Sequence, residues 1–153
     1  MEKVFYTDGA CSGNPGEGGW ACVEMTITDN DLKTNIISGK KEMTTNSEME
    51  LIAVYKALVK SYKEGAKRVT IYSDSAYIVN AVKLGWLMNW NNNGWRTKQD
   101  KEIKHKEVWQ KMYKLVYEKD MSVKIIKVKG HSGEPLNELA DREAVKAREA
   151  VKE

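Results

Sequence analysis

The hydrophobic pattern of this chain changes period near residue 45, and this change restricts the possible folds. Before it, three segments alternate apolar and polar residues as strands do, with short links between them (2–10, 19–28 and 33–42). After it, Thr45 and Glu48 form a capping box that begins a helix of about 17 residues, which Gly65 ends. A strand at 67–73 follows, and two strands joined by such a helix are normally parallel. The pattern therefore predicts an α/β protein with antiparallel and parallel strands.

The remaining elements are predicted from the same signals. A short helix is expected at 76–84, a helix at 106–118, a strand at 122–129 and a final helix from about residue 136. The glycine-rich stretch 10–19 is expected to form neither a helix nor a regular strand.

The composition indicates an ordinary globular chain. Its 153 residues are expected to form a single domain, 1–153, and a net charge of +3 argues against disorder or a strongly basic protein. Cys11 and Cys22 do not make a disulfide scaffold, so a reducing, cytoplasmic location is expected. The sequence shows no leader peptide and no apolar run near the roughly 20 residues that cross a bilayer.

Two aspartates, Asp8 and Asp74, each follow an apolar run at the end of a predicted strand. If the two strands are parallel neighbours, both carboxylates leave the sheet at the edge where open α/β sheets bind ligands. Two carboxylates so close repel each other unless a proton or a divalent cation lies between them. Two ordinary interpretations remain open: Asp8 could belong to a hairpin turn, and Asp74 could cap the helix that follows it.

Glu50 is a carboxylate within an otherwise apolar stretch, 49–55, of the first helix. A helix that is apolar on most sides is buried, and an unpaired buried charge is costly unless a basic partner or a metal compensates it. Asp141, early in the final helix, and His131, in the loop before it, are expected near the same sheet edge as Asp8 and Asp74. Taken alone, each of the two would be an ordinary surface residue.

The four acids Asp8, Glu50, Asp74 and Asp141 offer only oxygen ligands. Such a set predicts Mg²⁺ or Mn²⁺ and not zinc. Several carboxylates that hold cations with open coordination positions are typical of two-metal phosphodiester hydrolysis.

The segment from Lys83 to Trp109 contains four of the five tryptophans. From Lys83 to Lys106, six Lys or Arg residues and two acids give a net charge of +4 with His105 neutral. Basic charge among aromatic and Asn residues suits a nucleic-acid backbone. Trp90 and Trp95 could instead form a small packed core, and we expect both interpretations to hold.

Several motifs, in order along nearly the whole chain, resemble the ribonuclease H type 1 family: TDGACSGNPG (7–16), TTNSEMEL (44–51), YSDS (72–75), WLMNW (86–90), and VKGHSG (128–133) with NELAD (137–141). The resemblance implies a ribonuclease H-like five-stranded mixed sheet, with three antiparallel strands and then parallel strands, flanked by helices. It implies an endoribonuclease that hydrolyses the RNA strand of RNA–DNA hybrids and leaves 5′-phosphate and 3′-hydroxyl ends. The implied substrate is the hybrid, and the protein is expected to be a monomer.

The same resemblance assigns roles to individual residues. Asp8, Glu50, Asp74 and Asp141 match the catalytic acids that hold two Mg²⁺ ions, for which Mn²⁺ can substitute. His131 matches the family's mobile catalytic histidine, which is thought to help proton transfer or product release. Substrate contacts are matched by Cys11, Asn14, Thr45, Asn46 and Trp86. The segment at about 83–106 matches the hybrid-binding protrusion of the longer bacterial members.

Some substrate positions depart from the common bacterial pattern. Met43 and Asn91-Asn92-Asn93 stand where basic residues are frequent, Ser47 and Glu48 replace an Asn-Arg pair, and Ala76 replaces a Gln. Two other functional classes are possible. A non-catalytic hybrid-binding module would not need four converging acids, and a transposase or integrase core would carry a further DNA-binding or assembly domain.

Overall fold

Five strands pair into one mixed sheet in the order β3-β2-β1-β4-β5. The computed structural model describes residues 2–27, 29–30, 32–129 and 134–150. The strands are β1 (Glu2–Cys11), β2 (Gly16–Ile27), β3 (Leu32–Thr44), β4 (Arg68–Ser73) and β5 (Ser122–Lys127). Pairs β1–β2 and β2–β3 are antiparallel, and pairs β1–β4 and β4–β5 are parallel. The predicted fold class is therefore confirmed.

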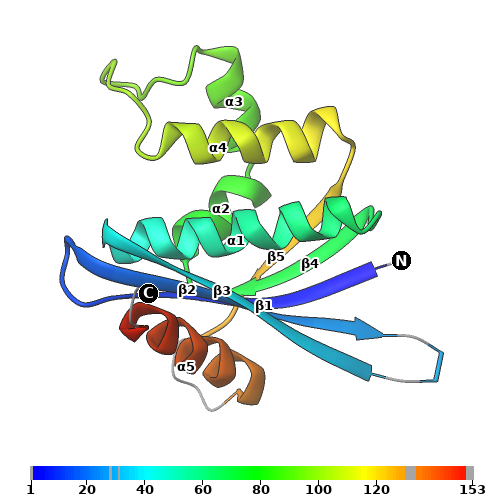
Figure 1. Ribbon diagram of the computed structural model, residues 1–153. Coiled ribbons are helices and arrows are strands. Elements are labelled where there is room, and N and C mark those ends of the chain that lie inside the picture. The colour runs from blue at the N-terminus through cyan, green and yellow to red at the C-terminus, as the bar shows by residue number, and fades with distance from the viewer. Residues whose placement is uncertain (1, 28, 31, 130–133, 151–153) are drawn as a thin grey trace.

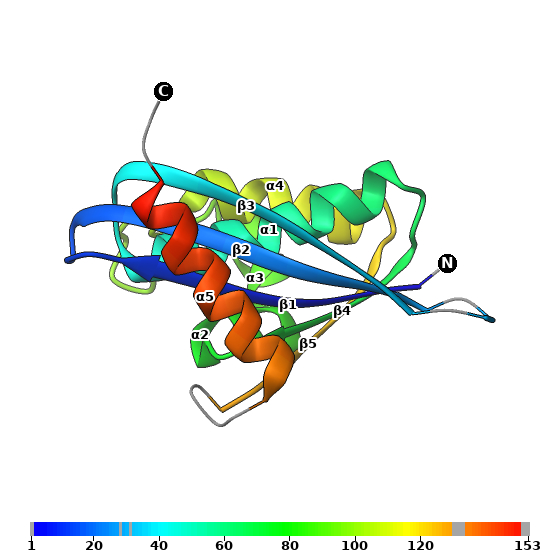
Figure 2. The same cartoon turned by 60° about the horizontal axis from the view of Figure 1, so that its bottom comes forward.

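The helices cover both faces of this sheet. They are α1 (Asn46–Lys63), α2 (Ala76–Lys83), α3 (Trp86–Asn92), α4 (Lys106–Tyr113) and α5 (Pro135–Glu149), with a short π-helix η1 (Lys114–Glu118) after α4. Helix α1 lies along one face, with α4 and then α3 stacked outward from it (Figure 1). On the opposite face, α5 crosses the strands diagonally (Figure 2). None of the helices in the described ranges is long and apolar enough to cross a membrane.

Helix α1 begins and ends as the sequence predicts. The Thr45 hydroxyl accepts a hydrogen bond from the Glu48 backbone N–H at 3.2 Å. Glu64 is the C-cap, and Gly65 follows with a φ of +79°, a conformation that favours glycine. The Glu48 carboxylate accepts a hydrogen bond from the Thr44 hydroxyl and pairs with Lys41 at 3.0 Å. The start of α1 is therefore tied to β3.

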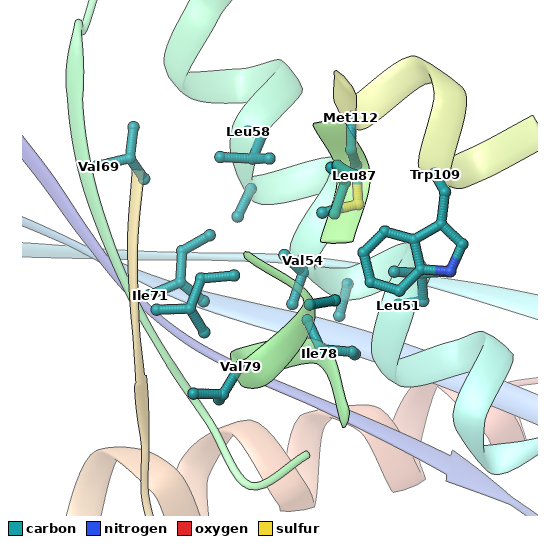
Figure 3. Packing of buried hydrophobic residues seen from close by; sticks show 14 of the residues in the cluster. Leu51, Val54, Leu58, Val69, Ile71, Ile78, Val79, Leu87, Trp109 and Met112 are labelled. Carbon is teal, nitrogen blue, oxygen red and sulfur yellow. The ribbon is translucent and has the colours of Figure 1, made fainter. Parts of the chain in front are cut away.

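The main core lies between α1 and the parallel half of the sheet (Figure 3). Its side chains come from α1, β4, α2, α3 and α4, among them Leu51, Val54, Leu58, Val69, Ile71, Ile78, Leu87, Trp109 and Met112. Each of these side chains is at most 2% exposed. Removing such area from water stabilises the fold by about 25 cal/mol per Å², so this core fixes α1 on the sheet.

The prediction for the glycine-rich stretch is wrong. Strand β1 continues to Cys11 and β2 begins at Gly16, so only residues 12–15 lie outside the strands. The glycines in the strands allow close approach of helices. A Cβ at Gly9 would lie 2.5 Å from the Glu50 backbone nitrogen, and one at Gly19 would lie 2.3 Å from the Ala144 carbonyl oxygen. Helices α1 and α5 therefore pack directly on strand backbone at these two positions.

We expect Gly19→Ala to destabilise the protein by about 3 kcal/mol or more, because the new methyl group would collide with the α5 backbone. Gly65→Ala is the control, since nothing lies within 4 Å of its Cβ position and only the φ of +79° opposes the change. That strain should cost about 1 kcal/mol. Urea unfolding of both variants measures the difference, and equal losses would contradict the close packing of α5.

The helix predicted at 106–118 is interrupted. Helix α4 ends at Tyr113, and residues 114–118 form η1, in which the Lys119 N–H donates to the Lys114 carbonyl at 2.9 Å. The predicted inner face is confirmed, because Trp109 and Met112 are buried while Leu115 and Val116 are partly buried against the core. The wider π turn keeps these last two side chains in contact with the core.

Candidate active site

Asp8 and Asp74 lie side by side because their strands are parallel neighbours. The pairing of β1 with β4 ends at Tyr6 and Tyr72, and each aspartate lies two residues farther along. Asp8 pairs with Ala21 inside the β1–β2 ladder, so it is not in a hairpin turn. Ser75, and not Asp74, caps α2, since its hydroxyl accepts a hydrogen bond from the Ile78 N–H at 3.3 Å. Both ordinary interpretations of the two aspartates are therefore wrong.

Glu50 joins the two aspartates from above the sheet. It lies in the second turn of α1, where that helix touches the β1 backbone at Gly9. One carboxylate oxygen each from Asp8, Glu50 and Asp74 lies within 4.8 Å of the others. A single divalent cation can bridge oxygens at this spacing, so the three acids form a candidate metal site.

Burial and mutual repulsion disturb the protonation of this cluster. Asp8 is only 8% exposed, and burial together with the charge of Asp74 raises its pKa to about 8. The Gly9 N–H donates to Asp8 at 2.9 Å and lowers this pKa, whereas a hydrogen bond and the charge of Asp141 raise it. Burial and the charge of Asp74 also raise the pKa of Glu50 to about 7. A divalent cation would replace the protons that these carboxyl groups otherwise retain.

The acids line an open cavity of about 260 Å³. Its lining residues are Asp8, Gly9, Ala10, Cys11, Asn46, Glu50, Asp74, Asp141, Val145 and Arg148. All four predicted acids therefore converge on one cavity. His131 lies outside the described residues, so its predicted place beside the acids stays a prediction.

The predicted substrate contacts divide into two groups. Cys11 and Asn46 line the cavity, and the Asn14 side-chain oxygen accepts the Asn46 N–H at 3.0 Å. The Thr45 hydroxyl caps α1 just beside them. Trp86 lies elsewhere, in a groove of about 510 Å³ that it shares with Tyr77, Trp90, Arg96 and Lys98 among others.

Sequence reasoning missed Val145 and Arg148, which also line the acid cavity. Neither belongs to a recognisable motif. They follow Asp141 by four and seven residues, and on a helix these spacings place side chains on one face. The helical period of α5, applied to Asp141, could have indicated both residues.

Both interpretations of the tryptophans have support in the structure. Trp95 and Trp109 are buried, and Trp90 packs against both with ring centroids 6.1 and 5.3 Å away. Trp86 touches Tyr77 edge to face with ring centroids at 5.4 Å, and Tyr77 is exposed. The inner rings form a packed core, while the outer ones line the groove.

The fold and the site together define an α/β protein with a divalent-metal type of carboxylate cluster at the edge of a five-stranded mixed sheet. A family model described as RNase H matches residues 1–149. Proteins named ribonuclease H from Syntrophomonas wolfei and Chlorobaculum parvum are 42% and 46% identical to this chain. The alignments cover 99% and 100% of this chain, and 97% and 99% of the relatives.

Solved structures agree with these relatives. The crystal structure of LC9-RNase H1, described as a type 1 RNase H with the type 2 active-site motif, superimposes with a TM-score of 0.83 at 28% identity. That match covers 96% of this chain and 72% of the other. The solution structure of the PFV RNase H domain gives a TM-score of 0.80 at 26% identity, over 95% and 93% of the two chains. The chain belongs to the RNase H family.

Proposed function

We propose that this protein is an endoribonuclease that hydrolyses the RNA strand of RNA–DNA hybrids and leaves 5′-phosphate and 3′-hydroxyl ends. Membership of the RNase H family supports the activity. The observation that carries the chemistry is the convergence of Asp8, Glu50 and Asp74, whose oxygens lie within 4.8 Å of one another. Four acids in one cavity have no evident use in a module that only binds hybrids.

The residues divide the work as follows. Asp8, Glu50, Asp74 and Asp141 hold two Mg²⁺ ions, or Mn²⁺ in their place. When bound, such ions supply an activated water and stabilise the leaving oxygen. Asp8 is the most buried of the acids and is in contact with the charges of both Asp74 and Asp141, so it suits a bridging position. His131 is assigned to proton transfer or product release.

Selectivity for a hybrid is proposed to come from two places. The turn 12–15 carries Asn14, whose carbonyl fixes the Asn46 backbone, and both residues lie beside Cys11 at the cavity. Polar groups there can read 2′-hydroxyls, which only RNA carries. The DNA strand is proposed to lie along Trp86 and a phosphate site near Thr45.

The test is cleavage of end-labelled RNA–DNA hybrid, duplex RNA and duplex DNA with Mg²⁺. We expect the hybrid alone to be cut, and EDTA to abolish the cleavage. Equal cutting of duplex RNA would contradict the proposed selectivity, and binding without any cleavage would indicate the non-catalytic module. Strand transfer to DNA would point to an integrase-like activity.

We also propose a single domain, 1–153, that acts as a monomer in the cytoplasm. All four acids line a cavity of one chain, so the site needs no second copy. Cys11 and Cys22 are free, as is usual in a reducing compartment.

The segment 83–106 is proposed to bind the hybrid as a basic protrusion. Arg96 pairs with Asp100 at 2.7 Å, and Lys106 pairs with Glu102 at 3.0 Å. These are the two acids of the segment, and pairing them leaves Lys83, Lys98, Lys101 and Lys104 exposed to carry the net charge of +4. Asn91, Asn92 and Asn93 are exposed on the same segment.

Replacing Asn91, Asn92 and Asn93 together with lysine should lower the Michaelis constant for hybrid and steepen its salt dependence. Each added phosphate contact changes the slope of log affinity against log salt by about 0.9 on duplex DNA, and a similar scale is expected here. The turnover rate should change little, because the acids lie elsewhere. Initial rates against hybrid concentration at two salt concentrations measure this effect.

The triple glutamine variant is the control for this experiment. Asn91 donates to the Tyr113 hydroxyl at 3.1 Å, and Asn93 accepts from the Arg96 N–H at 3.3 Å. Glutamine removes these contacts without adding charge. Identical kinetics of the lysine variant and the parent at both salt concentrations would show that this segment does not touch the substrate.

A further inference from the structure

Arg148 brings a positive charge into the acid cavity. It lies in the last turn of α5, seven residues after Asp141, so the two side chains share a face of the helix. Among the described residues that line this cavity, Arg148 is the one cation. Its side chain is only 22% exposed, so it is held within the protein surface and does not extend into solvent.

None of the acids in the cavity pairs with this guanidinium within the described part of the chain. The ion pair found for Arg148 joins its Nη2 atom to Glu149 Oε1 at 3.3 Å, and Glu149 is 67% exposed. Such an exposed pair contributes little. The donors of Arg148 are therefore available to a ligand that enters the cavity.

The backbone of Arg148 is held firmly in place. Helix α5 touches β2 at Gly19, where a Cβ would lie 2.4 Å from the Arg148 nitrogen. The Lys40 ammonium donates to the Ala150 carbonyl at 2.8 Å, which ties the end of α5 to β3. A side chain on an anchored backbone needs little further ordering to bind a ligand.

The acids of the cavity repel phosphate wherever cations do not neutralise them. A nucleic-acid strand that crosses the cavity needs a positive group for the phosphate beside the one being cleaved. Guanidinium groups match phosphate oxygens with two parallel hydrogen bonds. We propose that Arg148 is a positioning residue that binds a phosphate of the RNA strand next to the scissile one. This inference rests on the proposed function.

The first experiment compares Arg148→Gln, Arg148→Lys and Lys146→Gln in hybrid cleavage with saturating Mg²⁺. Lys146 is on the same helix but is 75% exposed and lies outside the cavity, so its variant removes the same charge without the contact. A lost hydrogen bond to a charged group is worth about 1.5–3 kcal/mol. We expect Arg148→Gln to raise the Michaelis constant by about tenfold or more, with a smaller change in turnover. Arg148→Lys should recover part of the loss, and Lys146→Gln should stay within about twofold of the parent.

The second experiment locates the phosphate with hybrids that carry one neutral methylphosphonate at a defined position of the RNA strand. The penalty of Arg148→Gln should disappear at one position within about two nucleotides of the cut, because the contact is then already absent. Thermal unfolding of each variant shows whether the fold is intact. Equal kinetics of Arg148→Gln and Lys146→Gln, or a penalty that persists at every position, would overturn the inference. A parent protein that does not cleave hybrid would instead overturn the proposed function.

Discussion

Asp8→Asn and Asp74→Asn should each lower hybrid cleavage at least about a thousandfold while the fold stays intact, because each removes a carboxylate proposed to hold metal. Unfolding midpoints without metal should stay level or rise. Asp8 has a pKa of about 8, raised first by burial and then by the charge of Asp74. At neutral pH the folded protein must therefore hold a proton on a group that is ionised when unfolded, and a neutral Asn avoids this cost.

Cleavage assays and thermal melts in EDTA measure the two effects on the same protein samples. Asp29→Asn is the matched control, since Asp29 lies in the exposed turn between β2 and β3. It should leave both cleavage and stability unchanged. A clear loss of stability with cleavage retained would mean that Asp8 or Asp74 is a structural residue.

The stability of the metal-free protein should fall as pH rises from about 5 to about 8. The folded pKa values of Asp8, about 8, and of Glu50, about 7, lie above their ordinary values of 3.8 and 4.5. Between those limits the folded state binds more protons than the unfolded state, so raising the pH favours unfolding. The stabilisation is fully present below about pH 4 and is lost as pH rises through about 8. We expect a total loss on the order of 3 kcal/mol.

Glu24 has the opposite effect at the acidic end. Burial raises its pKa, but hydrogen bonds and charges from Lys3 and Lys60 outweigh burial and hold the pKa below 4.5. Its contribution is present above about pH 4.5 and is lost as pH falls further. The metal-free protein should therefore be most stable near pH 5.

Urea unfolding at several pH values, with EDTA and with Mg²⁺, measures these changes. Mg²⁺ should remove most of the loss toward pH 8, because the cation takes the place of the protons. Asp8→Asn should flatten the metal-free profile in the same range. A metal-free stability that rises between pH 5 and pH 8 would show that the acids do not repel each other as the geometry requires.

The tertiary structure changed the interpretation of particular residues whose local sequence was misleading. Gly18 and Gly19 looked like part of a loop, yet both are in β2, since a strand glycine is needed where α5 or a neighbouring side chain comes too close for a Cβ. Asp74 looked like a helix cap, yet the next residue, Ser75, has that role. In both cases a local propensity gave way to contacts made by segments far apart in the chain.

The sequence by itself determined the strands, the first helix and the mixed sheet, because alternation, the Thr45 cap and the Gly65 stop are local signals. It also indicated the four acids, since strand ends and a lone carboxylate in an apolar helix can be read along the chain. Only the tertiary structure decided that Asp8 and Asp74 lie equally far beyond the last β1–β4 pair, and that Arg148 shares their cavity. Register and helix packing depend on contacts between distant segments, so distances and pKa shifts in the site follow from the assembled fold.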